Sequence, residues 1–220
     1  KGVKKDEAIF QVLRQYIIDS KKVRFEGDNY SDEWVKEAEK RGLTNITNVP
    51  EAYKAYFSEK TIKLYDELNI FTKNELTGRT GVRLETYTKK IQIEARVLGD
   101  LAINHIVPIG IKYQTELINN VKGLKDIFTE DEFNKLAGTR RELIKELSTH
   151  ITAIKAKVND MIEARKVANK IEDEMEKAQK YASTVLPFLD DIRYHIDKLE
   201  RIVNDQLWPL PKYRELLFTR

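Results

Sequence analysis

The stretch NELTGRTGVRLETYTKKIQIEARVLGDLAINHIVPIGIKYQTELINNVK, residues 74–122, decides the fold. Its apolar residues recur every three or four positions, the period of one helix face. The stripe consists of Leu84, Tyr87, Ile91, Leu98, Leu101 and His105. One very long helix is therefore expected here. A kink is expected near Asn104 to Pro108, because proline lacks the amide that would bond the Asn104 carbonyl and crowds that turn.

The same helical period precedes this stretch. A first helix is expected from about Asp6 to Ser20, with its apolar face made by Ile9, Val12, Leu13, Tyr16 and Ile17. Two short helices, around residues 51–57 and 59–68, follow a loop that ends at Pro50, a residue favoured at the first position of a helix. These helices would complete a compact N-terminal part.

Two more long helices follow the stretch. Thr129 is a helix N-cap candidate, and a second long helix is expected over residues 130–181. Its seam contains Leu143, Leu147, Ile151, Ile154, Val158 and Met161, with Arg165 and Glu172 in the same seam. A third helix over about residues 185–207, after a break at Pro187, would return antiparallel along the bundle, and the apolar tail from Trp208 would dock on the protein. The fold class is therefore all-α: short helices followed by an elongated antiparallel bundle of long helices.

The peptide VRFEGDNYSDEWVKEAEKRGL, residues 23–43, is a more specific local unit. A short extended run leads into a turn at Gly27, Asp28 and Asn29, and Ser31 stands where a helix N-cap belongs. Trp34, Val35 and Ala38 predict a buried stripe, and Gly42 is expected to cap the helix C-terminus.

The composition excludes several classes of protein. The chain is 41% hydrophobic and 34% charged, with 39 Lys and Arg against 36 Asp and Glu, so its +3 balance comes from interspersed charges. Nucleic acid is not an expected partner, because binding it requires clustered basic residues. No apolar run approaches the roughly 20 residues that span a bilayer, and with 0 cysteines the chain has no disulfide or thiolate chemistry. A soluble, cytoplasmic protein without membrane partners is expected.

No motif predicts a catalytic, cofactor-binding or metal-binding residue. His105, His150 and His195 lack a second ligand at helical spacing, although Asp191 precedes His195 by four residues. The acidic groups at residues 130–132 and 190–191 are best explained as charges at helix starts. The GRTG sequence, residues 78–81, lacks the features of a phosphate-binding loop and favours a weak point or a close helix crossing. Arg79 and Arg83 are expected to form a charged helix face with Glu75 and Glu85.

Four collinear strings give the chain a specific family resemblance. They are the peptide of residues 23–43, FTKNELTGRTGVRLETYTKKIQIEA (71–95), LAINHIVPIGIKYQ (101–114) and RYHIDKLERIVNDQLWPLPKYRELLF (193–218). In these strings the chain resembles the C-terminal region of type III glutamine synthetases. The resemblance implies a fragment of an ATP-dependent ligase that joins ammonia to glutamate.

The resemblance also implies the rest of the assembly. Residues 1–70 would be the last helices of the catalytic domain and residues 71–220 an extra helical domain. The catalytic sheet, with ATP and Mg or Mn, would lie upstream of residue 1, so the fragment alone would be inactive and would hold no cofactor. The family implies a homo-oligomer, a dodecamer of two stacked hexameric rings. Whether Arg24, Glu26, Arg79 or Arg83 reaches the active site of the intact enzyme is a question that the sequence leaves open.

Two other hypotheses remain at this point. The chain could be an independent antiparallel coiled-coil adaptor or scaffold, in which case the reading frame upstream would hold a start codon or an unrelated domain. An autonomous enzyme, the third hypothesis, predicts ATP turnover by the chain with glutamate and ammonia.

Overall fold

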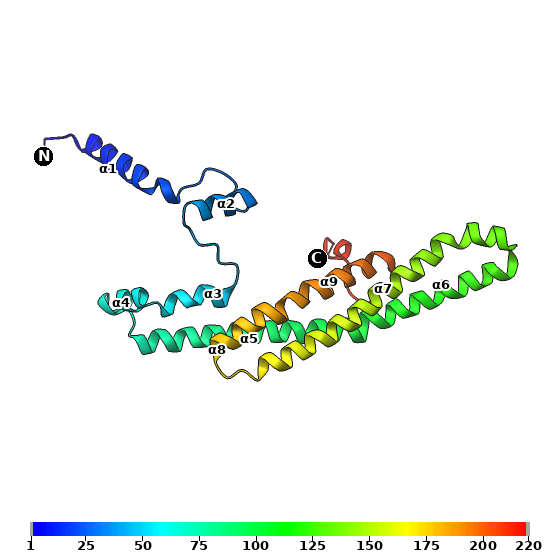
Figure 1. The fold of residues 1–220 in the computed structure, drawn as a ribbon. Coiled ribbons are helices and arrows are strands. Elements are labelled where there is room, and N and C mark those ends of the chain that lie inside the picture. The colour runs from blue at the N-terminus through cyan, green and yellow to red at the C-terminus, as the bar shows by residue number, and fades with distance from the viewer. Residues whose placement is uncertain (1, 219–220) are drawn as a thin grey trace. The chain divides into compact units, whose positions relative to one another are not determined.

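The computed structural model describes residues 2–218, and within that range the secondary structure is helical, without strands (Figure 1). The all-α prediction is confirmed. The chain divides into two compact units, residues 1–48 and 49–220, which we call units 1 and 2. The domain boundary near residue 70 came from the family resemblance and stays a prediction.

Unit 1 contains α1 (Lys5–Asp19), the 3₁₀ turn η1 (Ser20–Val23) and α2 (Asp32–Lys40). The predicted caps of α2 are confirmed. The Ser31 hydroxyl accepts a hydrogen bond from the Trp34 amide at 3.3 Å. At the other end Gly42 has a φ of +70°, and the amides of Gly42 and Leu43 donate to the carbonyls of Glu39 and Ala38 at 2.9 Å each. This Schellman motif requires a left-handed residue, which glycine supplies without strain.

The apolar faces of unit 1 are largely exposed within the described residues. Of the α2 stripe Ala38 is buried, but Val35 is 41% exposed, so the prediction of a buried Val35 was wrong. No residue of α1 is buried, and its predicted face is exposed between 48% at Ile9 and 68% at Tyr16. Unit 1 therefore carries an amphipathic helix whose apolar side meets no partner within the unit.

Unit 2 begins with α3 (Val49–Tyr53), the 3₁₀ turn η2 (Lys54–Phe57) and α4 (Glu59–Glu67). The long rod follows as α5 (Lys73–Leu101), the π-helical turn η3 (Ala102–Ile106) and α6 (Val107–Ile127). The chain then returns through α7 (Glu130–Asn169), α8 (Glu174–Lys180), the π-helical turn η4 (Tyr181–Val185) and α9 (Leu186–Ile202), and α10 (Tyr213–Leu216) lies in the tail.

A π-helical turn lies at the predicted kink before Pro108. The Val107 amide donates to the Ala102 carbonyl, five residues back, so the ladder widens by one residue before the proline. This extra residue shifts the buried stripe, with the result that Ile106 is fully buried and His105 is exposed. The placement of His105 on the stripe was therefore wrong.

The second long helix is shorter than predicted. It ends at Asn169, and after a turn the Asp173 carboxylate accepts from the Glu176 amide at 2.8 Å and starts α8. Glu172 thus lies in the turn and outside the seam. No break occurs at Pro187, because η4 passes into α9 with the Leu186 amide bonded to the Tyr181 carbonyl. The antiparallel return begins at α8, about 11 residues earlier than expected.

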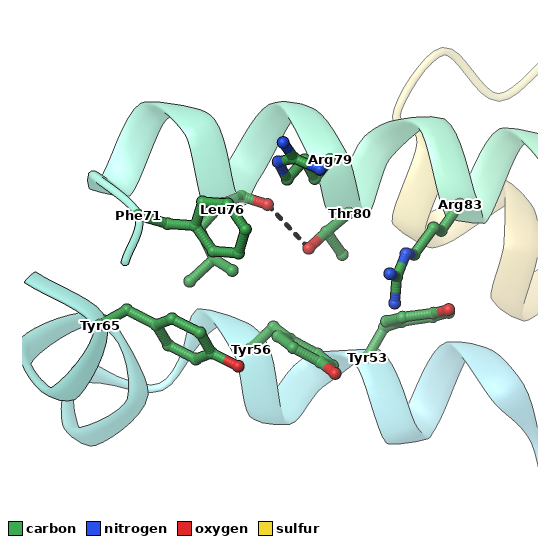
Figure 2. A pocket seen from close by; sticks show the side chains of 8 residues that line it. All are labelled: Tyr53, Tyr56, Tyr65, Phe71, Leu76, Arg79, Thr80 and Arg83. Atoms are coloured by element: carbon green, nitrogen blue, oxygen red, sulfur yellow. Dashed lines mark hydrogen bonds between the residues drawn. The ribbon is translucent and has the colours of Figure 1, made fainter. Parts of the chain in front are cut away.

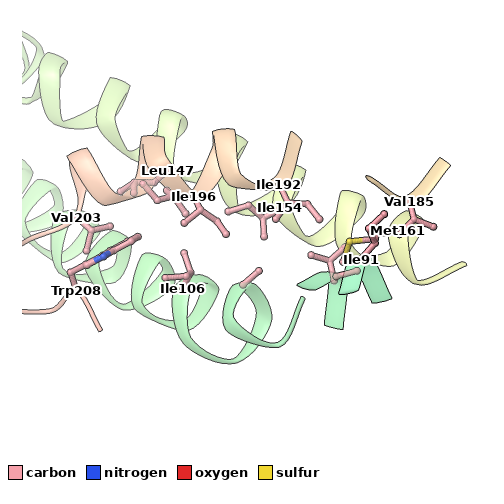
Figure 3. Close-up of a cluster of buried hydrophobic side chains, with 14 of the residues drawn as sticks. Ile91, Ile106, Leu147, Ile154, Met161, Val185, Ile192, Ile196, Val203 and Trp208 are labelled. Atoms are coloured by element: carbon pink, nitrogen blue, oxygen red, sulfur yellow. The ribbon is translucent and has the colours of Figure 1, made fainter. Parts of the chain in front are cut away.

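The core of unit 2 lies where α5–η3–α6, α7 and α9 run side by side (Figures 1 and 3). Its fully buried members include Ile106, Leu147, Ile154, Met161 and Ile192. In the tail Trp208 is 8% exposed and joins this core, whereas Leu217 and Phe218 are 63% and 78% exposed. The predicted docking of the tail is thus correct for its first half only.

Candidate functional site

A small cavity of about 100 Å³ lies between α5 and the preceding short helices (Figure 2). Its lining consists of Tyr53, Tyr56, Tyr65, Phe71, Leu76, Arg79, Thr80 and Arg83. We call this cavity the tyrosine–arginine pocket. It combines aromatic rings with two guanidinium groups, and its described lining contains no carboxylate.

Helical spacing brings the aromatic rings together. Tyr53 and Tyr56 are three residues apart across the α3–η2 junction, and their ring centroids are 5.7 Å apart. Phe71 stands just before α5 and stacks with Tyr65 at 5.7 Å and 25°. The four rings are half-buried; in Figure 2 the three tyrosines lie opposite the first turns of α5, and Phe71 lies on the α5 side beside Leu76.

A capping box fixes where α5 begins, and thus where Phe71 lies. The Thr72 amide and hydroxyl each donate to the Glu75 carboxylate at 2.8 Å, and the Glu75 amide donates to the Thr72 hydroxyl at 3.3 Å. These hydrogen bonds lower the pKa of the Glu75 carboxyl below its ordinary value, with a smaller contribution from the Arg79 charge. Glu75 is therefore engaged at the helix start.

Arg79 and Arg83 stand one turn apart on α5 and flank the pocket. The Arg79 guanidinium lies 4.6 Å from the centroid of the Phe71 ring, and Figure 2 shows Arg83 reaching toward Tyr53. These arginines are exposed on α5 together with Glu75 and Glu85, as a charged helix face requires. The Glu85 carboxylate binds the Lys89 ammonium at 2.6 Å. Among the described residues neither arginine forms an ion pair.

The GRTG sequence forms about one turn within α5. It makes no loop for phosphate, and a Cβ added at Gly78 or Gly81 would meet no other atom within 4 Å. Of the two alternatives predicted for GRTG, a weak point or a close helix crossing, the close crossing was wrong. Thr80 is buried and donates its hydroxyl to the Leu76 carbonyl at 2.8 Å.

Two of the three histidines meet in the bundle. Nδ1 of His150 on α7 lies 2.9 Å from Nδ1 of His195 on α9, so the pair holds one N–H···N hydrogen bond when a single proton is shared. Burial lowers the pKa of His195 below its ordinary value; the charges of His150 and Lys157 lower it further, whereas Asp191 raises it. Asp191 itself binds Lys157 at 2.7 Å across the two helices. The explanation of Asp191 as a helix-start charge was wrong, since the chain is helical from α8 through α9.

Arg24 has a structural role within unit 1. Its guanidinium donates to the Ile17 carbonyl at 2.8 Å, while Arg41 donates to the carbonyl of Arg24 itself and to those of Lys21 and Lys22 at 3.4 Å each. Two cations thus satisfy carbonyls at the C-terminal end of α1 and η1, which carries negative partial charge. Glu26 is exposed.

Sequence reasoning missed the pocket and the histidine pair. A signal for the pocket existed, because Tyr53, Tyr56, Tyr65 and Phe71 cluster within 19 positions before the two arginines. The histidines are 45 residues apart, and only the helix pairing brings them together.

Across residues 2–218 no cluster of three or more potential ligand side chains suits a metal ion. No helix in that range is long and apolar enough to cross a membrane.

Comparison with known proteins places this fold in a family. The model of the glutamine synthetase C-terminal domain matches residues 8–125. A protein named glutamine synthetase from Bacteroides fragilis (strain YCH46) is 54% identical over 219 residues, which cover 100% of this chain and 30% of that relative. The type-3 glutamine synthetase of Dictyostelium discoideum is 32% identical over 221 residues, covering 97% of this chain and 29% of that relative.

A third relative, the glutamine synthetase of Butyrivibrio fibrisolvens, is 29% identical over 213 residues, covering 97% of this chain and 30% of its own length. The chain thus spans about 30% of the length of these relatives. Their names agree with the resemblance to type III enzymes drawn from the sequence, and they do not favour an unrelated adaptor. The chain belongs to the family of glutamine synthetase C-terminal domains.

Proposed function

We propose that this chain is the non-catalytic C-terminal part of an ATP-dependent glutamate–ammonia ligase and that it supports assembly of the enzyme. The observation that carries the proposal is the 54% identity across the whole chain to a glutamine synthetase more than three times as long. In this proposal ATP and its Mg or Mn ions bind to the upstream part of the polypeptide, which also carries the catalytic residues.

Two apolar surfaces support a role in assembly. Ala8, Ile9, Val12, Leu13 and Tyr16 line an open apolar groove along α1 in unit 1. In unit 2 a second groove of about 580 Å³ runs between α6 and α7, where Val107, Ile111 and Ile151 face it. Exposed apolar surface of this extent is typical of interaction sites. We propose that the upstream part of the same polypeptide covers α1 and that another subunit covers the α6–α7 groove.

Deletion of residues 71–220 from the longer polypeptide tests this role. The intact polypeptide is expected to form glutamine from glutamate, ammonia and ATP and to scatter light as a large oligomer. The deleted form is expected to contain fewer subunits per particle, because it lacks the α6–α7 groove. The same number of subunits after the deletion, calculated from the molar mass of the shortened polypeptide, would refute the assembly role. An upstream reading frame without ligase activity would refute the assignment to the enzyme.

A further inference from the structure

The two arginines of the tyrosine–arginine pocket form no ion pair within residues 2–218. Arg79 and Arg83 are four residues apart on one helix, a spacing at which like charges repel. The nearest acidic residues along α5 are engaged elsewhere, Glu75 by Thr72 and Glu85 by Lys89. A bound anion would relieve this repulsion.

The pocket also offers neutral hydrogen-bond donors. The phenol hydroxyls of Tyr53, Tyr56 and Tyr65 have no hydrogen-bond partner among the described residues, and each is able to donate one hydrogen bond. Guanidinium groups provide planar, two-pronged donors that match carboxylate and phosphate oxygens. The donor set is therefore suited to an oxyanion.

The pocket has room for a small ligand. Its volume of about 100 Å³ exceeds the roughly 10–15 Å³ that a single water molecule needs. This space suits a phosphate or a carboxylate group. We propose that the tyrosine–arginine pocket binds a phosphate-sized oxyanion, held by Arg79 and Arg83 and by the tyrosine hydroxyls. The proposal depends on residues 53–83 alone and is independent of the proposed ligase function.

Calorimetric titration of the chain with inorganic phosphate at constant ionic strength tests this site. Saturable binding with one site per chain is expected. Arg83→Gln is expected to weaken it about tenfold and the double variant Arg79→Gln/Arg83→Gln to abolish it, since hydrogen bonds from a charged donor are stronger than those between neutral groups. Arg96→Gln removes an exposed arginine farther along α5 and is the matched control, which should bind as the parent chain does. Thermal unfolding of each variant verifies that it is folded.

A second titration with acetate distinguishes the two sources of such a group. Tighter binding of phosphate would indicate a site for free phosphate, and equal or tighter binding of acetate would indicate a binding site for an acidic side chain. Either result supports the proposal if the double arginine variant no longer binds the anion. Failure of both anions to bind, or equal binding by the double variant, would overturn the proposal.

Discussion

Individual residues of α5 show how single polar groups tune stability. The Thr88 hydroxyl is buried on α5 and has no hydrogen-bond partner among the described residues, whereas Thr86, two residues earlier and exposed, donates to the Val82 carbonyl at 2.8 Å. An unpaired buried hydroxyl destabilises a fold, because on folding it loses its hydrogen bond to water and gains no other hydrogen bond in exchange.

Thr88→Val is therefore expected to raise the free energy of unfolding by about 1 kcal/mol, because it replaces the hydroxyl by a methyl group of similar size. Urea denaturation monitored by circular dichroism measures the change. Thr86→Val is the control and should stay within about 0.5 kcal/mol of the parent chain. A loss of stability in Thr88→Val would show instead that a water molecule satisfies the hydroxyl.

Glycines of the bundle differ in what surrounds them. A Cβ at Gly110 on α6 would lie 3.2 Å from Cδ1 of Ile151 and 3.7 Å from Cδ1 of Leu199, whereas one at Gly138 on α7 would meet nothing within 4 Å. Gly138→Ala should stabilise the chain by about 0.5–1 kcal/mol through helix propensity, and Gly110→Ala should lose that gain to crowding. Thermal unfolding distinguishes them. Equal stabilisation by both would mean that the helices are not in close contact at Gly110.

At the scale of elements, local signals predicted where helices start but not every place where they end. Ser31 and Thr129, the two predicted N-caps, each precede a helix, as side chains that compete for the first free amides do. The end of α7 at Asn169 carries neither glycine nor proline, and the apolar period continues past it, so the sequence favoured one longer helix. Pro108 and Pro187 both follow π-helical turns, and the helix continues through both prolines. A continuous helix was predicted at Pro108, whereas a break was predicted at Pro187.

The pairing of α7 with α9 should depend on pH through His195. Its pKa in the folded chain lies below the ordinary value of about 6.5, so between those two pKa values the unfolded chain binds the proton and the folded chain does not. Stability is therefore full above about pH 7 and falls as the pH decreases below about 6.5. Urea midpoints at pH 7.5 and 5.5 measure this fall.

His195→Gln should flatten that pH dependence, because it removes the titrating imidazole. His105→Gln is the control, since His105 is exposed on η3 and should leave the dependence unchanged. An identical fall in the His195 variant and the parent chain would assign the pH dependence to other groups.

At the scale of the whole molecule, the composition and the helical spacing of apolar residues were enough to predict the fold class, but not the contacts between residues far apart in the sequence. The meeting of His150 with His195 and of Tyr53 with Arg83 depends on how helices pair, and a single sequence holds no direct record of that pairing. The apolar period of α1 was predicted correctly, yet period alone does not say which partner covers it.

The partner of α1 is open to a direct test, because the chain has 0 cysteines. A thiol introduced by Val12→Cys should react freely in the chain, where Val12 is 54% exposed. In the longer polypeptide it should react at least about tenfold more slowly, because a buried thiol reacts only when the structure around it opens transiently. Gln11→Cys, on the polar side of α1, should react quickly in both, and peptide mass spectrometry separates these thiols from any upstream ones. Equal reactivity of the two thiols in the longer polypeptide would contradict docking of α1.

Phosphate release tests the central claim most directly. The chain by itself and the longer polypeptide are each supplied with ATP, magnesium, glutamate and ammonia, and inorganic phosphate is measured over time. We predict release by the longer polypeptide that requires both glutamate and ammonia, and none above background from the chain. Release by the chain that depends on both substrates would contradict the claim that the reaction centre lies outside it.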